Sequence, residues 1–135
     1  MNETTLHATR ASAVARGAAV LGATAAATAI WAVAATAGVD LTVSFGSGQP
    51  VQKVTVVNVV VAALVGSLAG WGLLALLERF TARARAIWTV VAMLVAVLSL
   101  GAPLSSIASP GTKVSLAAMH LVVSAVMIVV LRRTT

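Results

Sequence analysis

Four long apolar runs, separated by short polar breaks, fill most of this 135-residue chain. The predicted helices are at about 14–37, 55–77, 86–104 and 110–131. Each run is close to the roughly 20 residues that an α-helix needs to cross about 30 Å of hydrocarbon. Hydrophobic residues make up 60% of the chain and charged residues only 9%, so in water it would expose large apolar patches. The sequence therefore predicts an all-α membrane protein, a four-transmembrane-helix bundle in which residues 1–135 form a single transmembrane domain.

The basic residues predict how the bundle is oriented. Seven arginines fall on one side of the predicted spans: Arg10, Arg16, Arg79, Arg83, Arg85, Arg132 and Arg133. Only Lys53 and Lys113 fall on the other side. Cytoplasmic loops are enriched in Lys and Arg, so we expect a multi-pass protein of the cell membrane with both termini in the cytoplasm. The same rule accounts for the net charge of +6 without nucleic acid as a partner.

The first apolar run has a second interpretation, as a cleaved signal peptide. The segment Ala35-Thr36-Ala37 has the small-x-small form of a cleavage site. However, the apolar stretch is longer than the usual 7–15 residues of such a signal. Retention as a helix is therefore favoured, and cleavage would leave three spans.

The segment between the first two spans, at about 39–56, predicts an outer β-hairpin. Apolar and polar residues alternate on both sides of a Gly- and Pro-containing turn at 46–50, which is the period-two pattern of half-buried strands. The apolar face includes Leu41, Val43 and Phe45. An isolated two-stranded hairpin is marginal in water, so it has to pack on the helices or on a partner; the alternative is a flexible loop.

Small residues recur along one face of each of the first two helices. The first stripe comprises Ala15, Ala18, Gly22, Ala25, Ala29, Ala32 and Thr36, and the second comprises Asn58, Ala62, Gly66 and Gly70. In lipid, close backbone approach along such stripes supports helix association. We therefore predict helix packing through Gly22, Gly66 and Gly70, either between the first two helices or at a seam with a second copy or another membrane protein.

One ionisable residue, His120, lies inside a predicted span, and such residues are candidates for function. Ser124 shares its helix face, while Asn58 and Ser99 lie at similar depths in other helices and Asp40 lies just above. These five residues form a candidate ligand-binding cluster that opens to the outside. The alternative is structural: a neutral His120 that hydrogen-bonds a neighbouring helix.

The inventory of reactive side chains argues against a metal, a cofactor or cation-coupled export. The chain has no cysteine, and its second histidine is His7 in the N-terminal segment, so no ligand set for a transition metal is expected. The carboxylates are Glu3, Asp40 and Glu78, none of them in mid-membrane. A proton-coupled exporter normally uses a buried carboxylate, so this class is disfavoured.

Catalysis is not expected either. The nucleophile and base closest in sequence inside a span are Ser124 and His120, one helical turn apart, a spacing that arises often by chance.

At the inner side, Glu78 and the arginines beside it predict a solvated charged turn. Trp31 and Trp88 lie near opposite interfaces, as aromatic-belt residues do.

Several short segments together resemble a known family. They are Gly70–Glu78 (GWGLLALLE), Arg85–Trp88 (RAIW), Thr112–Lys113, Met119–Leu121 (MHL) and Gly38–Val43 (GVDLTV). In their order along the chain, these segments resemble a family of small four-helix membrane proteins from actinobacteria, catalogued as a domain of unknown function. The resemblance implies a four-span bundle and no established activity. The matched positions for a shared site are Asp40, Trp71, Glu78, Trp88 and His120.

Two functions remain open from the sequence. The chain is either a non-enzymatic accessory or structural component of the cell envelope, or a carrier or binder of a small or lipid-like ligand in a polar cavity around His120. Membrane lipids are expected partners in both. The two functions differ in whether a pocket reaches the imidazole.

Overall fold

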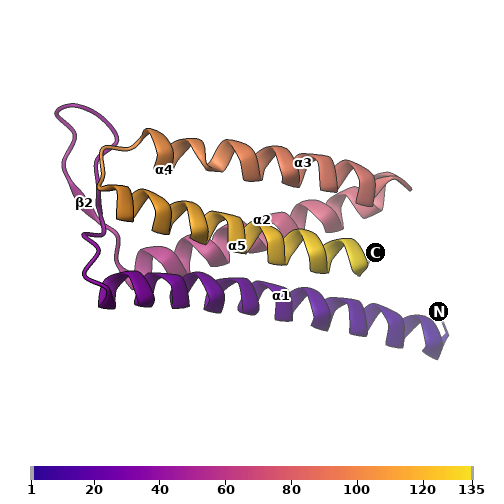
Figure 1. Ribbon diagram of the computed structural model, residues 1–135. Helices are drawn as coiled ribbons and strands as arrows, with labels where there is room; N and C mark the ends of the chain where they lie inside the picture. Colours follow the sequence, from indigo (N-terminus) through magenta and orange to yellow (C-terminus); the bar gives the residue numbers. More distant parts are fainter. Residues whose placement is uncertain (1, 135) are drawn as a thin grey trace.

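The structure, a computed structural model, describes residues 2–134. Its elements in chain order are α1 (Glu3–Thr36), β1 (Thr42–Val43), β2 (Gln52–Lys53), α2 (Val56–Phe80), α3 (Ala84–Ser99), α4 (Gly101–Ser105) and α5 (Pro110–Arg133). The long helices form one bundle, with both chain termini at one end and the hairpin at the other (Figure 1). We call these the terminal end and the hairpin end.

Four helical segments are long and apolar enough to cross a membrane. They are Glu3–Thr36, Val56–Phe80, Ala84–Ser105 and Pro110–Arg133. Large apolar side chains such as Val61, Leu94 and Leu98 lie exposed on their outer surfaces, where a bilayer would cover them. The predicted architecture, four long apolar helices with a short hairpin between the first two, is confirmed.

Two helix boundaries differ from the prediction. The first helix begins at Glu3 rather than near residue 14, because Asn2 caps it by accepting a hydrogen bond from the Thr5 amide at 3.1 Å. With 34 residues at 1.5 Å each, α1 is about 51 Å long, so its polar N-terminal turns extend beyond the hydrocarbon. The third span is interrupted between Ser99 and Gly101.

The hairpin is held by a third segment. Thr42 pairs with Lys53 and Val43 with Gln52 in an antiparallel ladder. On the other side of β1, the Ser44 amide donates to the Ile107 carbonyl at 3.0 Å, and the Ser44 carbonyl accepts from the Ile107 amide at 2.8 Å. The loop before α5 therefore supplies the additional pairing that a two-stranded hairpin needs.

The predicted apolar face of the hairpin is correct at Leu41 and Val43 and wrong at Phe45. Leu41 and Val43 are buried, but Phe45 is 59% exposed. The alternation ends at Ser44, whose hydroxyl donates to the carbonyls of Gly46 and Gln49. These hydrogen bonds turn the chain at Ser44, and the Phe45 side chain lies exposed instead of packing on the bundle.

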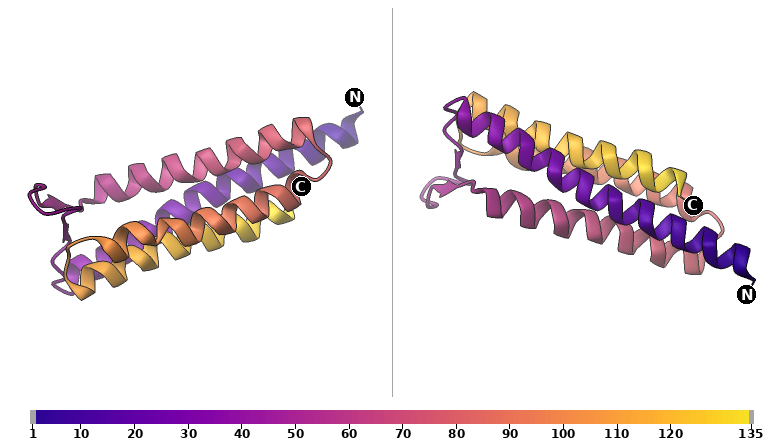
Figure 2. Two further views of the ribbon diagram at one scale, coloured as in Figure 1. Left: turned by 90° about the horizontal axis from the view of Figure 1, so that it is seen from above. Right: turned by 90° about the horizontal axis from the view of Figure 1, so that it is seen from below.

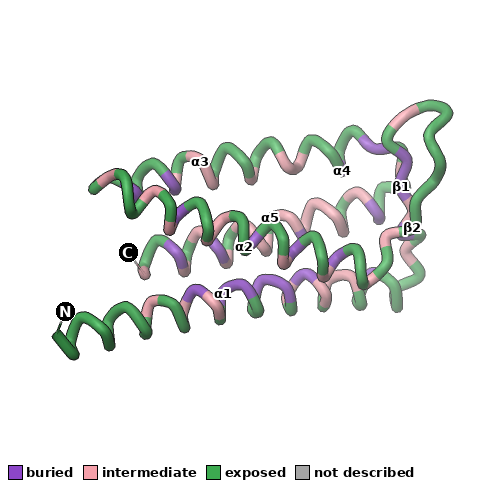
Figure 3. The backbone as a smooth tube through the Cα atoms, turned by 180° about the vertical axis from the view of Figure 1, so that it is seen from behind, coloured by how far each residue is buried: buried purple, intermediate pink, exposed green. Residues whose placement is uncertain are grey.

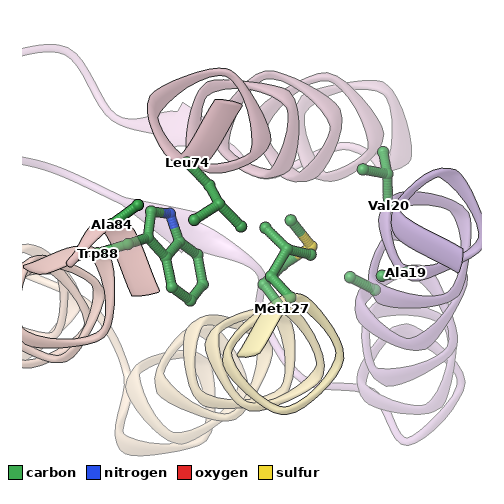
Figure 4. Packing of buried hydrophobic residues seen from close by; sticks show 8 residues of the cluster. Ala19, Val20, Leu74, Ala84, Trp88 and Met127 are labelled. Atoms are coloured by element: carbon green, nitrogen blue, oxygen red, sulfur yellow. The ribbon is translucent and has the colours of Figure 1, made fainter. Parts of the chain in front are cut away.

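Two buried clusters fill the bundle. The cluster at the terminal end contains Ala19, Val20, Ala23, Leu74, Ala84, Trp88, Met127 and Leu131, and Figure 4 shows side chains from α1, α2, α3 and α5 directed into the space between these helices. The cluster at the hairpin end contains Ala27, Val59, Ala63 and Met119 and includes no residue of α3. Much of α3 is exposed (Figure 3). The third helix thus contributes to the core mainly near the terminal end.

Two tryptophans hydrogen-bond to backbone carbonyls of other segments, and for the half-buried Trp31 a place in an aromatic belt stays a prediction. Trp88 is only 2% exposed, and its Nε1 donates to the Gly70 carbonyl of α2 at 2.8 Å. Its predicted place in an aromatic belt is therefore wrong. Trp31 Nε1 donates to the Val54 carbonyl at 2.8 Å, just before α2. Each indole N–H has the acceptor that a buried tryptophan requires.

An ion pair joins α1 to α2 at the terminal end. The Arg16 guanidinium contacts Glu78 through two hydrogen bonds, Nη1 to Oε2 at 3.0 Å and Nη2 to Oε1 at 2.6 Å. The Arg16 side chain is 8% exposed and that of Glu78 is 33% exposed. Glu78 is exposed, as predicted, but its partner comes from α1 and not from the neighbouring loop.

The same arginine also forms hydrogen bonds to Thr134, the residue that follows α5. Arg16 Nε donates to the Thr134 hydroxyl at 2.9 Å, and Nη2 donates to the Thr134 carbonyl at 3.1 Å. The Ser12 hydroxyl donates to that carbonyl as well, at 2.8 Å. One buried guanidinium thereby connects α1, α2 and the residue that follows α5.

Replacing Glu78 by Gln removes the negative charge while keeping the shape, and leaves Arg16 buried without its counterion. We expect a loss of about 1–3 kcal/mol in the free energy of unfolding, because a charge-assisted pair is broken from one side only. Unfolding in detergent micelles measures the change.

The double variant Arg16→Met/Glu78→Gln is the control for this pair. It should lose less stability than the sum of the two single changes, since no charge remains unpaired. Strictly additive losses would show that the two side chains do not interact.

Candidate functional site

A crevice of about 370 Å³ lies between α2 and α5 in the hairpin half of the bundle. Its lining comprises Ala27, Val54, Asn58, Val59, Ala62, Ala63, Gly66, Leu116, Met119, His120, Val123 and Ser124; we call it the α2–α5 crevice. The floor is the buried cluster of Ala27, Val59, Ala63 and Met119. The cavity thus sits directly on the core at this end.

Two rows of residues at helical spacing form the rims. Asn58, Ala62 and Gly66 follow one another every four residues on α2, and Leu116, His120 and Ser124 do the same on α5. Residues four apart lie on one helix face. The crevice is therefore a groove between two helix faces, with an apolar floor and three polar side chains on its rims.

The course of α2 leaves this groove open. Figure 1 shows the end of α2 near the start of α3 at the terminal end, where Trp88 bonds to Gly70; at the hairpin end, Trp31 of α1 bonds to the Val54 carbonyl just before α2. Figure 2 shows the same four helices from above and below. Within residues 2–134, no side chain of α3 or α4 lines the crevice, and Asn58 and Gly66 are exposed. In a bilayer, lipid would meet the groove from the side.

The ring nitrogens of His120 have different surroundings. Nδ1 lies 2.7 Å from the carbonyl oxygen of Leu116, one turn earlier on α5. A carbonyl oxygen only accepts hydrogen bonds, so Nδ1 carries the proton of this bond. No hydrogen bond joins Nε2 to another group between residues 2 and 134, and the half-buried ring lines the crevice.

In the Asn58 amide group, the oxygen already accepts hydrogen bonds, whereas the nitrogen does not take part in them. Its Oδ1 accepts from the Thr55 amide at 3.0 Å and from the Thr55 hydroxyl at 2.6 Å, completing a capping box at the start of α2. A backbone N–H can only donate, so the atom that faces it is the amide oxygen. The Nδ2 group is left as a donor at the mouth of the crevice.

Three of the five predicted site residues come together: His120, Asn58 and Ser124 line the crevice. The other two lie elsewhere. The Ser99 hydroxyl donates to the Ala96 carbonyl of its own helix at 2.8 Å. The Asp40 carboxylate accepts from the Thr42 hydroxyl at 2.9 Å, and the backbone carbonyl of Asp40 accepts from the Thr112 hydroxyl. Asp40 thus joins the hairpin to the start of α5, above the crevice.

The three glycines predicted to pack helices have unequal environments. A methyl group at Gly22 or at Gly66 would meet no atom within 4 Å, whereas one at Gly70 would lie 3.9 Å from Met127 and 4.0 Å from Trp88. Packing within the chain at Gly22 and Gly66 was therefore wrongly predicted, and Gly66 lines the crevice instead. A contact between two copies through Gly22 stays a prediction.

The arrangement shows no assembled catalytic or metal-binding group. Within the described residues, no three His, Cys, Asp or Glu side chains lie close enough to hold a metal ion. No hydrogen bond there joins the Ser124 hydroxyl to His120, whose Nδ1 is bonded to Leu116. What the crevice offers is shape, an apolar floor and hydrogen-bonding groups.

Sequence reasoning missed the rim residues Ala62 and Leu116 as parts of a site. Their signal was present in the four-residue spacing that links Leu116 to His120 and Ser124. It could not show which helix would face them, because α2 and α5 lie far apart in the chain.

Replacing Gly66 by Ala distinguishes a crevice from a helix contact. Because the added methyl meets open space, we expect stability to be unchanged or to rise by up to about 1 kcal/mol, as for Gly→Ala in a helix. A glycine at a close helix contact would instead lose stability. Thermal unfolding in detergent is the measurement.

Gly111→Ala is the matched control, since its methyl would lie 3.3 Å from Val39 Cγ1. It should be the less stable of the two variants. The reverse order would contradict the placement of α2.

Comparison with known proteins adds one finding. Residues 7–135 match the model of a family of unknown function, DUF6069. The chain matches no curated protein and no solved structure.

Proposed function

The chain belongs to DUF6069, a family of unknown function, and we propose that it is a non-enzymatic membrane protein that holds a lipid-like ligand in the α2–α5 crevice. The observation behind this proposal is a cavity of about 370 Å³ that reaches His120. The two functions left open by the sequence differ on this point. A bundle closed over a satisfied imidazole would have favoured a purely structural role.

The lining favours a lipid-like ligand over a polar one. Nine of the twelve lining residues are apolar or glycine, and none is an aspartate, glutamate, lysine or arginine. The volume falls within the roughly 300–1,000 Å³ of small-molecule sites. Because the groove opens to the side, an apolar molecule could move in from the bilayer without leaving hydrocarbon.

The chemistry of the rims supports binding rather than catalysis. Covalent catalysis needs a nucleophile activated by a base within hydrogen-bond reach. Ser124 has no such bond to His120 within residues 2–134. We therefore assign the protein an accessory role in the membrane, with membrane lipids as its first partners; association with a second copy or another membrane protein is compatible with it.

We also propose that both termini face the cytoplasm in the cell membrane. Arg79, Arg83 and Arg85 lie in or beside the turn at the terminal end, and Arg132 and Arg133 lie near the end of α5. Lys53 and Lys113 belong to the hairpin end. An excess of arginine in short loops on one side supports this orientation, and it places the mouth of the crevice in the outer half of the bilayer.

Filling the crevice tests the proposal. Gly66→Phe places a ring into the groove, whereas Gly22→Phe adds the same ring to an exposed position of α1 where nothing lies within 4 Å. Native mass spectrometry of the purified proteins should show lipid retained by the wild type and by Gly22→Phe, and retention several-fold lower in Gly66→Phe.

Thermal unfolding of the three proteins checks that each is folded. Equal lipid retention in the two phenylalanine variants would rule out the α2–α5 crevice as the binding site.

A further inference from the structure

We propose that the crevice selects lipids with a free hydroxyl group, such as a diacylglycerol or a long-chain alcohol, and that this hydroxyl donates a hydrogen bond to Nε2 of His120. The inference rests on the proposed function and deepens it, because it names the chemical class of the ligand. It follows from the hydrogen bonds that the rim side chains already make.

The acceptor comes from the tautomer of His120. With Nδ1–H donated to the Leu116 carbonyl at 2.7 Å, a neutral imidazole has only a lone pair at Nε2. The lining contains no carboxylate that would pair with an imidazolium. The imidazole therefore presents an acceptor to the crevice, and the ligand has to supply the proton.

The opposite rim supplies a donor. Oδ1 of Asn58 is occupied by the two bonds from Thr55, so the amide group that remains for a ligand is Nδ2, which donates. A lipid hydroxyl can give its proton to His120, and an oxygen atom of the same lipid can accept from Asn58.

Other lipid headgroups fit these rims less well. An ester, ether or ketone oxygen has no proton to give to Nε2. A phosphate or carboxylate would bring a negative charge to a site where no lysine or arginine is among the lining residues. The set of rim groups thus favours a neutral hydroxyl over both alternatives.

The test compares two neutral lipids that differ in a single group: 1,2-dioleoylglycerol and its 3-methyl ether. Delipidated full-length protein in detergent is titrated with each, and bound lipid is counted by native mass spectrometry. We expect the wild type to bind the alcohol about five- to tenfold more tightly than the ether, the effect of one hydrogen bond.

Two variants assign the preference to its residues. His120→Phe keeps an aromatic ring in the groove but removes the acceptor, so the preference for the alcohol should fall to about one. Asn58→Ala removes the amide donor without adding a charge, so binding of the alcohol should weaken, and thermal unfolding checks that the variant stays folded. Ser99→Ala, which lies outside the crevice and bonds only within its own helix, is the control and should keep the preference.

The outcomes separate the two proposals. Equal binding of both lipids by the wild type, abolished by Gly66→Phe, would leave the crevice as the site and refute selection by a hydroxyl. A preference that persists in His120→Phe would refute the role of Nε2. Failure of the wild type to bind either lipid, or unchanged binding in Gly66→Phe, would refute the proposed function itself.

Discussion

The hydrogen bonds of the buried Arg16 guanidinium are the interaction on which the terminal end of this bundle depends. In lipid, apolar surface gains little by leaving one apolar neighbour for another, so helix association relies on close packing and polar bonds. Arg16 makes such bonds to Glu78 of α2 and to Thr134 beyond α5. Trp88 adds the bond from α3 to α2. Three helices and the end of the chain are therefore fixed relative to one another before any apolar contact is counted.

At the hairpin end, the hydrogen bonds between segments are made by loops and helix starts, not by side chains in the middle of the helices. This difference explains why a crevice remains between α2 and α5. The Thr112 hydroxyl bonds to Asp40, and Trp31 bonds to the Val54 carbonyl, so the loops and helix starts are joined at the rim of the bundle. Between the two fastened ends, α2 presents Ala62 and Gly66 toward α5. Small side chains can bring helices together or leave a space between them. Here the hydrogen bonds at the two ends of the bundle fix the positions of α2 and α5. Because Ala62 and Gly66 are too small to fill the space between these helices, a cavity remains there.

The sequence predicted the features that follow from local pattern. Apolar run length determined the four spans, and alternation determined the hairpin as far as Val43. It could not show which surfaces would meet. Arg16 and Glu78 are 62 residues apart, and each alone has the pattern of a solvated residue at a membrane boundary. Gly22 and Gly66 are small enough for close packing, but nothing in their own helices shows whether a neighbour is present. Of the candidate site, the pattern found His120, Asn58 and Ser124, whereas Ser99 and Asp40 matched only in depth.

The bonding of His120 bears on why an imidazole is present in this span. A histidine that held helices together would bond to a neighbouring helix, as the structural alternative requires. His120 bonds instead to the Leu116 carbonyl of α5 itself, which adds nothing to the attachment of α5 to α1, α2 or α3. A leucine would be less costly in hydrocarbon and would fill more of the groove. The imidazole therefore adds no hydrogen bond between helices within residues 2–134, and its second nitrogen is available to the crevice that it lines.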